Sequence, residues 1–169
     1  MISRRVHLLS IFICWLAAHA ATGAAQARPT SVAVLDFGDT VMGRSVADKL
    51  SLALSSDAGL LLMDREESRA AARGAGYAGS LNMSLEEARD LGAAIGCDFY
   101  LTGDAQTLRR SPSAGPLYYE AYSSIFLVSA RTGKLVLWER PHFEAASPEE
   151  AEKSLLRELN QRAVRLSAA

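Results

Sequence analysis

Cysteine and histidine are scarce in this sequence of 169 residues, which holds two cysteines and three histidines. After removal of the N-terminal leader described below, only Cys97 and His142 remain. One cysteine cannot form a disulfide within the chain, and a zinc centre requires three or four converging ligands. We therefore predict a domain with no internal disulfide, no metal and no cofactor, in which Cys97 is a small buried side chain.

A long apolar run is also missing. The apolar stretch over residues 6–18, which follows a short basic segment, is about 13 residues long, whereas a membrane-spanning helix needs about 20. Small residues follow it, and Ala25-Gln26-Ala27 fits the pattern that signal peptidase cleaves. We predict a signal peptide over residues 1–27, with cleavage after Ala25 or an uncleaved anchor as alternatives. The protein is then expected in the periplasm or outside the cell.

The chain also lacks an excess of positive charge. It has 18 basic and 19 acidic residues, and loss of the signal peptide would leave 16 against 19, a net charge of −3. Nucleic acids and anionic membrane surfaces attract proteins through clustered positive charge, so we expect neither as the main partner. The 142 residues from Arg28 onward match the usual size of one domain, which predicts a single domain over residues 28–169.

Patterns typical of catalysis are missing as well. No Gly-x-Ser-x-Gly elbow is present, and His142 lies beside Pro141 without the partners of a nucleophilic triad. Residues Gly74–Gly79 match G-x-G-x-x-G, but they follow a predicted helix, whereas the dinucleotide fingerprint joins a strand to a helix. We interpret this segment as a flexible linker and predict that the protein is not an enzyme.

What the sequence does contain is an alternation of strand and helix patterns. Ser31–Phe37 is a short apolar run rich in β-branched residues, typical of a strand buried on both faces. Ser84 and Glu87 form a capping box that predicts a helix start, and Ser147 predicts another. In chain order we expect a strand over 31–37, a helix over 44–55, a strand over 60–63, helices over 65–73 and 84–95, a strand over 99–107, a hairpin of 117–129 and 135–143, and a last helix from 147 that frays after 164. The fold class is therefore α/β, with a mixed sheet of about five strands packed with helices.

Two groups of residues are candidates for contact with a partner or ligand. The first is Arg109 and Arg110, in a predicted exposed loop over 109–116, together with Tyr118, Tyr119 and Tyr122 of the following strand. Arginine and tyrosine are favoured in interface hot spots, although tyrosine in a strand also serves ordinary packing.

The second group is Asp36 and Asp39, at the carboxyl end of the first strand. Open α/β sheets often hold ligands at that place. The alternative interpretation is a turn that caps the next helix.

Short motifs along the chain resemble the envelope α/β domain of the CsgG, LpoB and TolB-amino-terminal group. The segments that carry the resemblance are Val32–Phe37, Ala47–Leu50, Leu62–Arg65, Ala88–Gly92, Gly96–Asp98, Leu101–Gly103 and Thr132-Gly133. The resemblance covers residues 31 to about 163 and implies a free-standing envelope domain whose relatives work by docking to other proteins. The chain departs from the group in lacking a lipobox at Cys14 and a membrane-spanning hairpin at 109–116.

Two functional hypotheses follow. The preferred one is an exported, non-catalytic docking or assembly module of the bacterial cell envelope, whose protein partner the sequence does not identify. The alternative is a small-ligand-binding protein or weak hydrolase that uses the Asp36 and Asp39 end of the sheet.

Overall fold

A computed structural model describes residues 28–169, and the predicted signal peptide lies outside these residues. The apolar strand β1 (Thr30–Val34) lies between two parallel neighbours, β2 (Leu60–Leu62) and β3 (Phe99–Arg110). Strand β4 (Tyr118–Ser129) is antiparallel to β3 along the whole of its length. The outer side of β4 pairs with β5 (Leu135–Glu139) and then with β6 (His142–Ala145), which completes a six-stranded mixed sheet.

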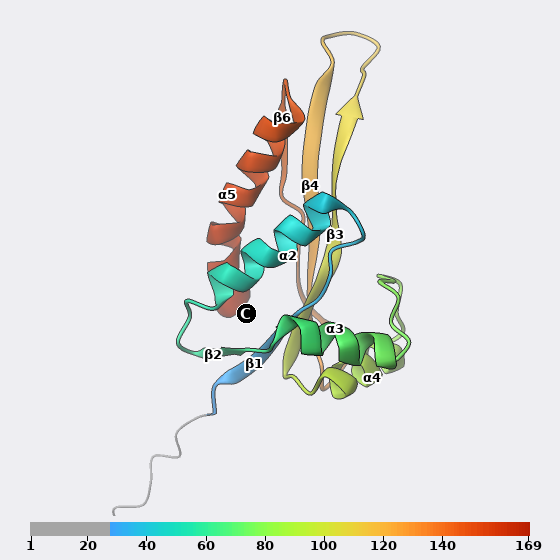
Figure 1. The fold of residues 1–169 in the computed structure, drawn as a ribbon, viewed down its shortest axis with the longest axis vertical. Coiled ribbons are helices and arrows are strands. Elements are labelled where there is room, and N and C mark those ends of the chain that lie inside the picture. The colour runs from blue at the N-terminus through green and yellow to red at the C-terminus, as the bar shows by residue number, and fades with distance from the viewer. Residues whose placement is uncertain (1–27) are drawn as a thin grey trace, which may run out of the picture.

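Four helices cover the sheet in two layers (Figure 1). Helices α2 (Val41–Leu54) and α5 (Pro148–Ser167) pack against each other and on one face, over a core that includes Val34, Leu101 and Ile125. Helices α3 (Arg65–Gly74) and α4 (Leu85–Ile95) lie on the opposite face, over Ala33, Leu35 and Tyr100. The prediction of a mixed α/β sheet packed with helices is confirmed, with six strands in place of about five.

Polar caps define the helix starts. Ser84 and Glu87 form the predicted capping box, in which the Ser84 hydroxyl accepts from the Glu87 amide and the Glu87 carboxylate accepts from the Ser84 amide. Ser147 caps α5 ahead of a first-position proline, as expected. Helix α5 continues as far as Ser167, so the predicted fraying after residue 164 is wrong.

The strands differ from the prediction in two places. Arg109 and Arg110 belong to β3 and are not in a loop, because they pair with Tyr119 and Tyr118. The predicted strand over 135–143 is interrupted after Glu139, and the carbonyl of Pro141 at the break accepts from the Ser123 amide at 3.1 Å. Proline has no amide hydrogen for the ladder, which explains the division into β5 and β6.

The two helical layers do not reach equally far along the sheet. Strands β3 and β4 are each 12 residues long, and they rise beyond α3 and α4 in Figure 1, whereas α5 follows them along the other face. At the amino end of β3, Tyr100 is buried between the sheet and α4, and its hydroxyl donates to the carbonyl of Ala88. The far half of the β3–β4 hairpin is therefore covered on one face only.

Candidate functional site

The uncovered part of the sheet forms a continuous surface, here called the open face. Side chains alternate between the two faces of a strand. On β3, Thr102 bonds Tyr77 on the α3 side, whereas Thr107 donates to Glu152 of α5, so the even-numbered positions of β3 face away from α5. With their partners across the sheet, the open face consists of Asp104, Gln106, Leu108, Arg110, Tyr118, Glu120, Tyr122, Ser124, Phe126, Trp138, Arg140, His142 and Glu144.

Aromatic rings lie along the open face, with Tyr122 in its middle and the pair Phe126 and Trp138 at its border with the α3 and α4 layer. The rings of Phe126 and Trp138 stack with centroids 6.5 Å apart and an interplanar angle of 18°. Trp138 remains 55% exposed, although it is the largest of the exposed apolar side chains in residues 28–169. The guanidinium of Arg140 lies 4.6 Å from the centre of the Tyr122 ring, in cation–π geometry. Exposed aromatic and arginine side chains of this kind are typical of protein interface hot spots.

Hydrogen bonds fix the polar side chains among these rings. One oxygen of Asp104 accepts from the Tyr122 hydroxyl at 3.1 Å and from the Gln106 amide at 3.0 Å. Partial burial and the bond to Asp104 raise the pKa of Tyr122. The Arg110 guanidinium donates to Glu120 at 2.8 Å, and this carboxylate raises the pKa of Arg110. The open face is thus largely ordered before any partner binds, which lowers the entropic cost of binding.

The open face separates the predicted contact residues into two groups. Arg110, Tyr118 and Tyr122 lie on it together. Arg109 and Tyr119 are opposite each other on the other side of the sheet, where Tyr119 packs against the core under α5. The structure therefore does not bring all five residues into one surface.

Sequence reasoning missed three prominent members of the open face, namely Phe126, Trp138 and Arg140. The available signal was the hairpin register, which would have put Phe126 and Trp138 opposite each other on the face of Tyr122. His142, for which the sequence shows no triad partners, lies exposed on β6 at the margin of this surface.

The second predicted group, Asp36 and Asp39, lines a separate cavity of about 350 Å³, here called the β1 cavity. Its wall is formed by Leu35, Asp36, Gly38, Asp39, Arg69, Ala72, Arg73, Tyr77, Ala78 and Gly79. Asp36 accepts from Arg69 at 2.8 Å and from Arg65 at 3.3 Å, and its charge raises the pKa of Arg69. Helix α2 is capped by the hydroxyl of Thr40, so neither carboxylate has the capping role considered above.

The glycine-rich segment Gly74–Gly79 contributes Tyr77, Ala78 and Gly79 to one wall of the β1 cavity. It leads from the end of α3 towards the cap of α4 and therefore lies between two helices, as the sequence indicated. Tyr77 anchors it, because its hydroxyl lies 2.7 Å from the Thr102 hydroxyl and its amide donates to the Ala72 carbonyl. Burial raises the pKa of Tyr77. Because this segment was interpreted as a flexible linker, Arg69, Arg73 and Tyr77 were not predicted as neighbours of the two aspartates.

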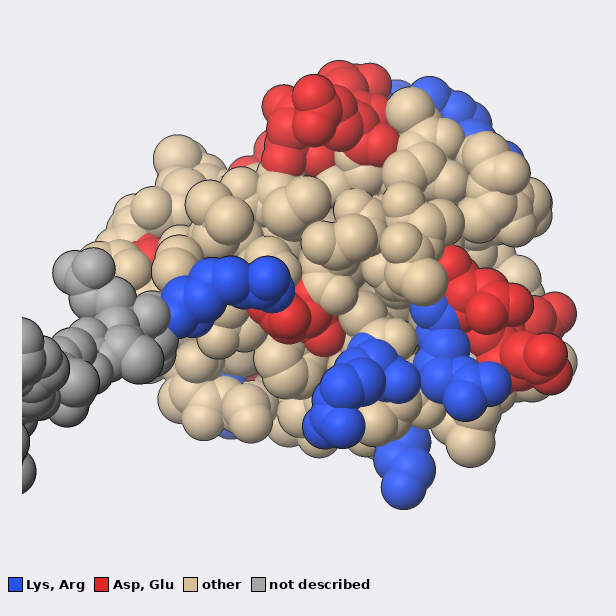
Figure 2. Space-filling view, turned by 90° about the horizontal axis from the view of Figure 1, so that it is seen from below, with Lys and Arg blue, Asp and Glu red and all other residues tan. Residues whose placement is uncertain are grey.

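The opposite end of the sheet carries charges of both signs. Figure 2 views this end and shows basic and acidic side chains interleaved. Arg28 forms an ion pair with Asp98 at 3.0 Å, and Asp98 also accepts from the amide and hydroxyl of Ser31. These bonds, led by the one from the Ser31 amide, lower the pKa of Asp98 to about 2. Next to it, burial raises the pKa of the half-buried Cys97 thiol to about 11, so the thiolate is disfavoured.

Two further observations concern the described residues only. Within residues 28–169, no group of three or more histidine, cysteine or acidic side chains is arranged to hold a metal ion. No helix in the same range has the length and apolar character needed to cross a bilayer.

Comparison with known proteins gives structural neighbours only. No protein-family model matches the sequence, and no curated protein is similar to it. The fold is similar to that of the hypothetical protein CT253 from Chlamydia trachomatis, with a TM-score of 0.55 and 15% identity over 84% of this chain and 100% of that one. It is also similar to the lipoprotein GNA1162 from Neisseria meningitidis, with a TM-score of 0.55 and 18% identity over 83% of this chain and 99% of that one.

A third neighbour is more distant. The LpoB C-terminal domain from Salmonella enterica aligns with a TM-score of 0.47 and 12% identity, over 75% of this chain and 91% of that one. At these identities, the comparisons establish a shared α/β fold. Membership of the narrower CsgG and TolB group stays a prediction.

Proposed function

We propose that this protein is an exported, non-catalytic docking module of the bacterial cell envelope, and that the open face is its contact surface for a protein partner. The observation that carries the proposal is the uncovered half of the β3–β4 hairpin. Beside it, on the edge strand β5, Trp138 is 55% exposed and stacks on Phe126, which packs against the core under α3 and α4 at the border of the open face. Tryptophan is among the residues most enriched in interface hot spots.

The edge strand supports the same surface. Strand β5 lies at the margin of the sheet and exposes Leu135, Val136 and Trp138 at 53%, 40% and 55%. Large exposed apolar side chains that cluster on one edge mark an interaction site more often than ordinary surface does. A partner seated on the open face would cover this margin as well.

Location in the envelope is part of the proposal. It is supported by the predicted signal peptide and by the fold that this chain shares with the lipoprotein GNA1162. Binding is preferred to catalysis because the best-ordered carboxylates are engaged in structural bonds. Asp36 is held by two arginines, Asp104 by Tyr122 and Gln106, and Glu120 by Arg110.

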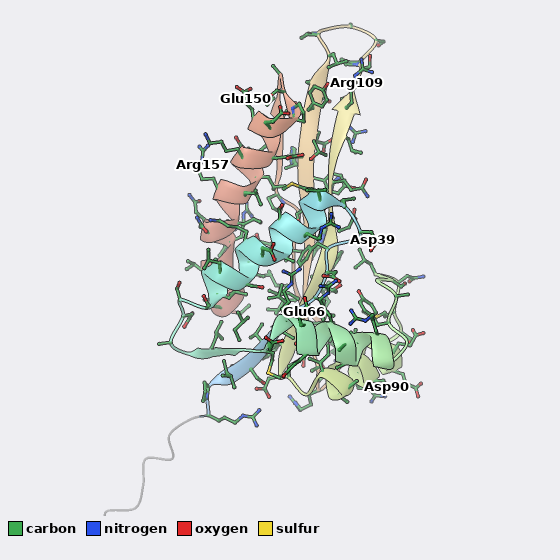
Figure 3. The ribbon with its side chains drawn as sticks, in the orientation of Figure 1. Asp39, Glu66, Asp90, Arg109, Glu150 and Arg157 are labelled. Atoms are coloured by element: carbon green, nitrogen blue, oxygen red, sulfur yellow. The ribbon has the colours of Figure 1, made fainter. Side chains whose placement is uncertain are left out.

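Site-specific photo-crosslinking in living cells tests the docking surface. A photoreactive amino acid at Glu144, exposed on the open face, should capture a discrete envelope protein. The same amino acid at Arg157, exposed on α5 on the other side of the sheet, is the matched control and should not capture it (Figure 3). Trp138→Ala should reduce the Glu144 crosslink at least about tenfold, because truncation of a hot-spot residue costs more than about 1 to 2 kcal/mol of binding. Equal capture from both positions, or no effect of Trp138→Ala, would reject the open face.

A further inference from the structure

The β1 cavity is a hollow with polar and apolar walls that lies outside the open face. Its volume of about 350 Å³ falls in the range of small-molecule sites. Leu35 and Ala72 are buried beneath it and give it an apolar floor, and Tyr77 closes one side. Charged residues stand on its rim, with two acids from the segment after β1 and two arginines from α3.

Only some of the charged side chains on this rim are paired with one another. Asp36 accepts from Arg65 and Arg69, and Arg69 also donates to Glu66 at 2.9 Å, so these groups satisfy one another. Within residues 28–169, neither the Asp39 carboxylate nor the Arg73 guanidinium has a side-chain hydrogen bond or an ion pair. Both nevertheless line the same cavity. Figure 3 shows Asp39 on the segment that leads into α2, above α3 in the view, and Arg73 is in the last turn of α3.

We propose that the β1 cavity binds a small zwitterion, an α-amino acid or the end of a short peptide that carries an ammonium and a carboxylate. Asp39 would bind the ammonium group, Arg73 would bind the carboxylate, and the apolar floor would receive a small side chain. A simple anion would meet the two aspartates, and a simple cation would meet the two arginines of the rim. A ligand with both charges is complementary to the acidic side and to the basic side of the rim.

The site is independent of the open face. The two surfaces adjoin at Gly38, because a side chain added there would come within 2.9 Å of Asp104. They use different residues, however, so either proposal can fail alone. Loss of the Glu144 crosslink bears on the docking surface, and loss of zwitterion binding bears on the cavity.

Amide chemical shifts recorded by NMR on residues 28–169 with added ligand test the proposal. L-alanine and L-alanyl-L-alanine should shift the amides of Gly76 and Gly79 saturably, and comparison of the two separates a free amino acid from a peptide end. N-acetyl-L-alanine lacks the ammonium group and L-alaninamide lacks the carboxylate, so each should bind about three- to fivefold more weakly, as expected for loss of one exposed ion pair. Equal binding of N-acetyl-L-alanine would reveal a plain anion site and overturn the proposal.

Variants give a second measurement. Arg73→Gln and Asp39→Asn should each weaken the binding of L-alanyl-L-alanine about three- to fivefold. Arg131→Gln and Asp90→Asn are matched controls, because both residues are exposed and line a different hollow. All four positions are on the surface, so the fold should survive each change, and the dispersion of the amide spectrum reports this. No saturable shift with either zwitterion, or a control variant that weakens binding as much, would also overturn the proposal.

Discussion

The two halves of the β3–β4 hairpin share their strands but not their surroundings. In the half nearest β1, helices lie on both faces, and Tyr100 and Leu101 are completely buried. In the far half, α5 covers one face and the other is the open face. There, Gln106, Leu108 and Tyr122 remain partly exposed.

This difference shows how one pair of strands serves stability and contact at once. The covered half supplies the apolar burial that stabilises the domain. The open half is held in shape from one side, by α5, and by hydrogen bonds across its surface such as the bond from Tyr122 to Asp104. The side chains on its open face remain partly exposed, which leaves their outer surfaces available for a partner.

The largest expected effect is on stability, and it should separate the two halves within one strand. Leu101→Ala removes a side chain with no exposed surface and should lower the free energy of unfolding by about 2 to 5 kcal/mol. Leu108→Ala, in the open half of the same strand, should cost less than about 1.5 kcal/mol, because its side chain is already partly in water. Urea denaturation followed by circular dichroism measures both, and equal losses would show that the halves contribute alike to stability.

An intermediate effect is expected on partner binding. Arg110→Glu removes the ion pair with Glu120 and places a further carboxylate beside it on the open face, so it should reduce capture of the partner from Glu144 about tenfold. Arg109→Glu makes the same change of charge on the other side of the sheet and should reduce capture less than about threefold.

Quantitative crosslinking of both variants, beside their thermal midpoints, distinguishes lost contact from lost stability. If Arg109→Glu has the larger effect at equal stability, the contact surface lies on the α5 side.

The covered half was largely predictable from sequence, because the helix caps and the pattern of apolar residues favour the same structure there. The apolar run before Asp36 and the capping box at Ser84 have few alternative interpretations, and both took the expected structure. The extent of β3 was underestimated. Arg109 and Arg110 carry no apolar signal, and their place in the strand comes from pairing with β4, which is a tertiary interaction.

The candidate surfaces were only partly predictable, for two physical reasons. Alternation along a strand tells which residues share a face, but which face stays open depends on where the helices pack. Arg110 and Arg109 were therefore grouped, although they lie on opposite sides. Trp138 and Phe126 were not singled out, because an apolar side chain has the same sequence signal whether or not a helix covers it. Arg73 and Asp39 line the same cavity only because the chain returns to the end of β1 after it leaves β2.

The smallest effect concerns pH and the covered end of the sheet, where Asp98 joins Arg28 and Ser31 to the start of β3. The folded-state pKa of Asp98 is lowered from 3.8 to about 2, so its stabilising contribution is complete above about pH 4 and is lost as the pH falls towards 2. The side chain is 40% exposed, so we expect a contribution below about 1 kcal/mol after screening by solvent. Urea midpoints of the wild type and of Asp98→Asn at pH 6, 4, 3 and 2 measure it. The difference between the two proteins should shrink across this window, which separates Asp98 from other carboxylates such as Glu87, whose pKa is also lowered. A difference that stays constant down to pH 2 would mean that the Asp98 bonds do not depend on its charge.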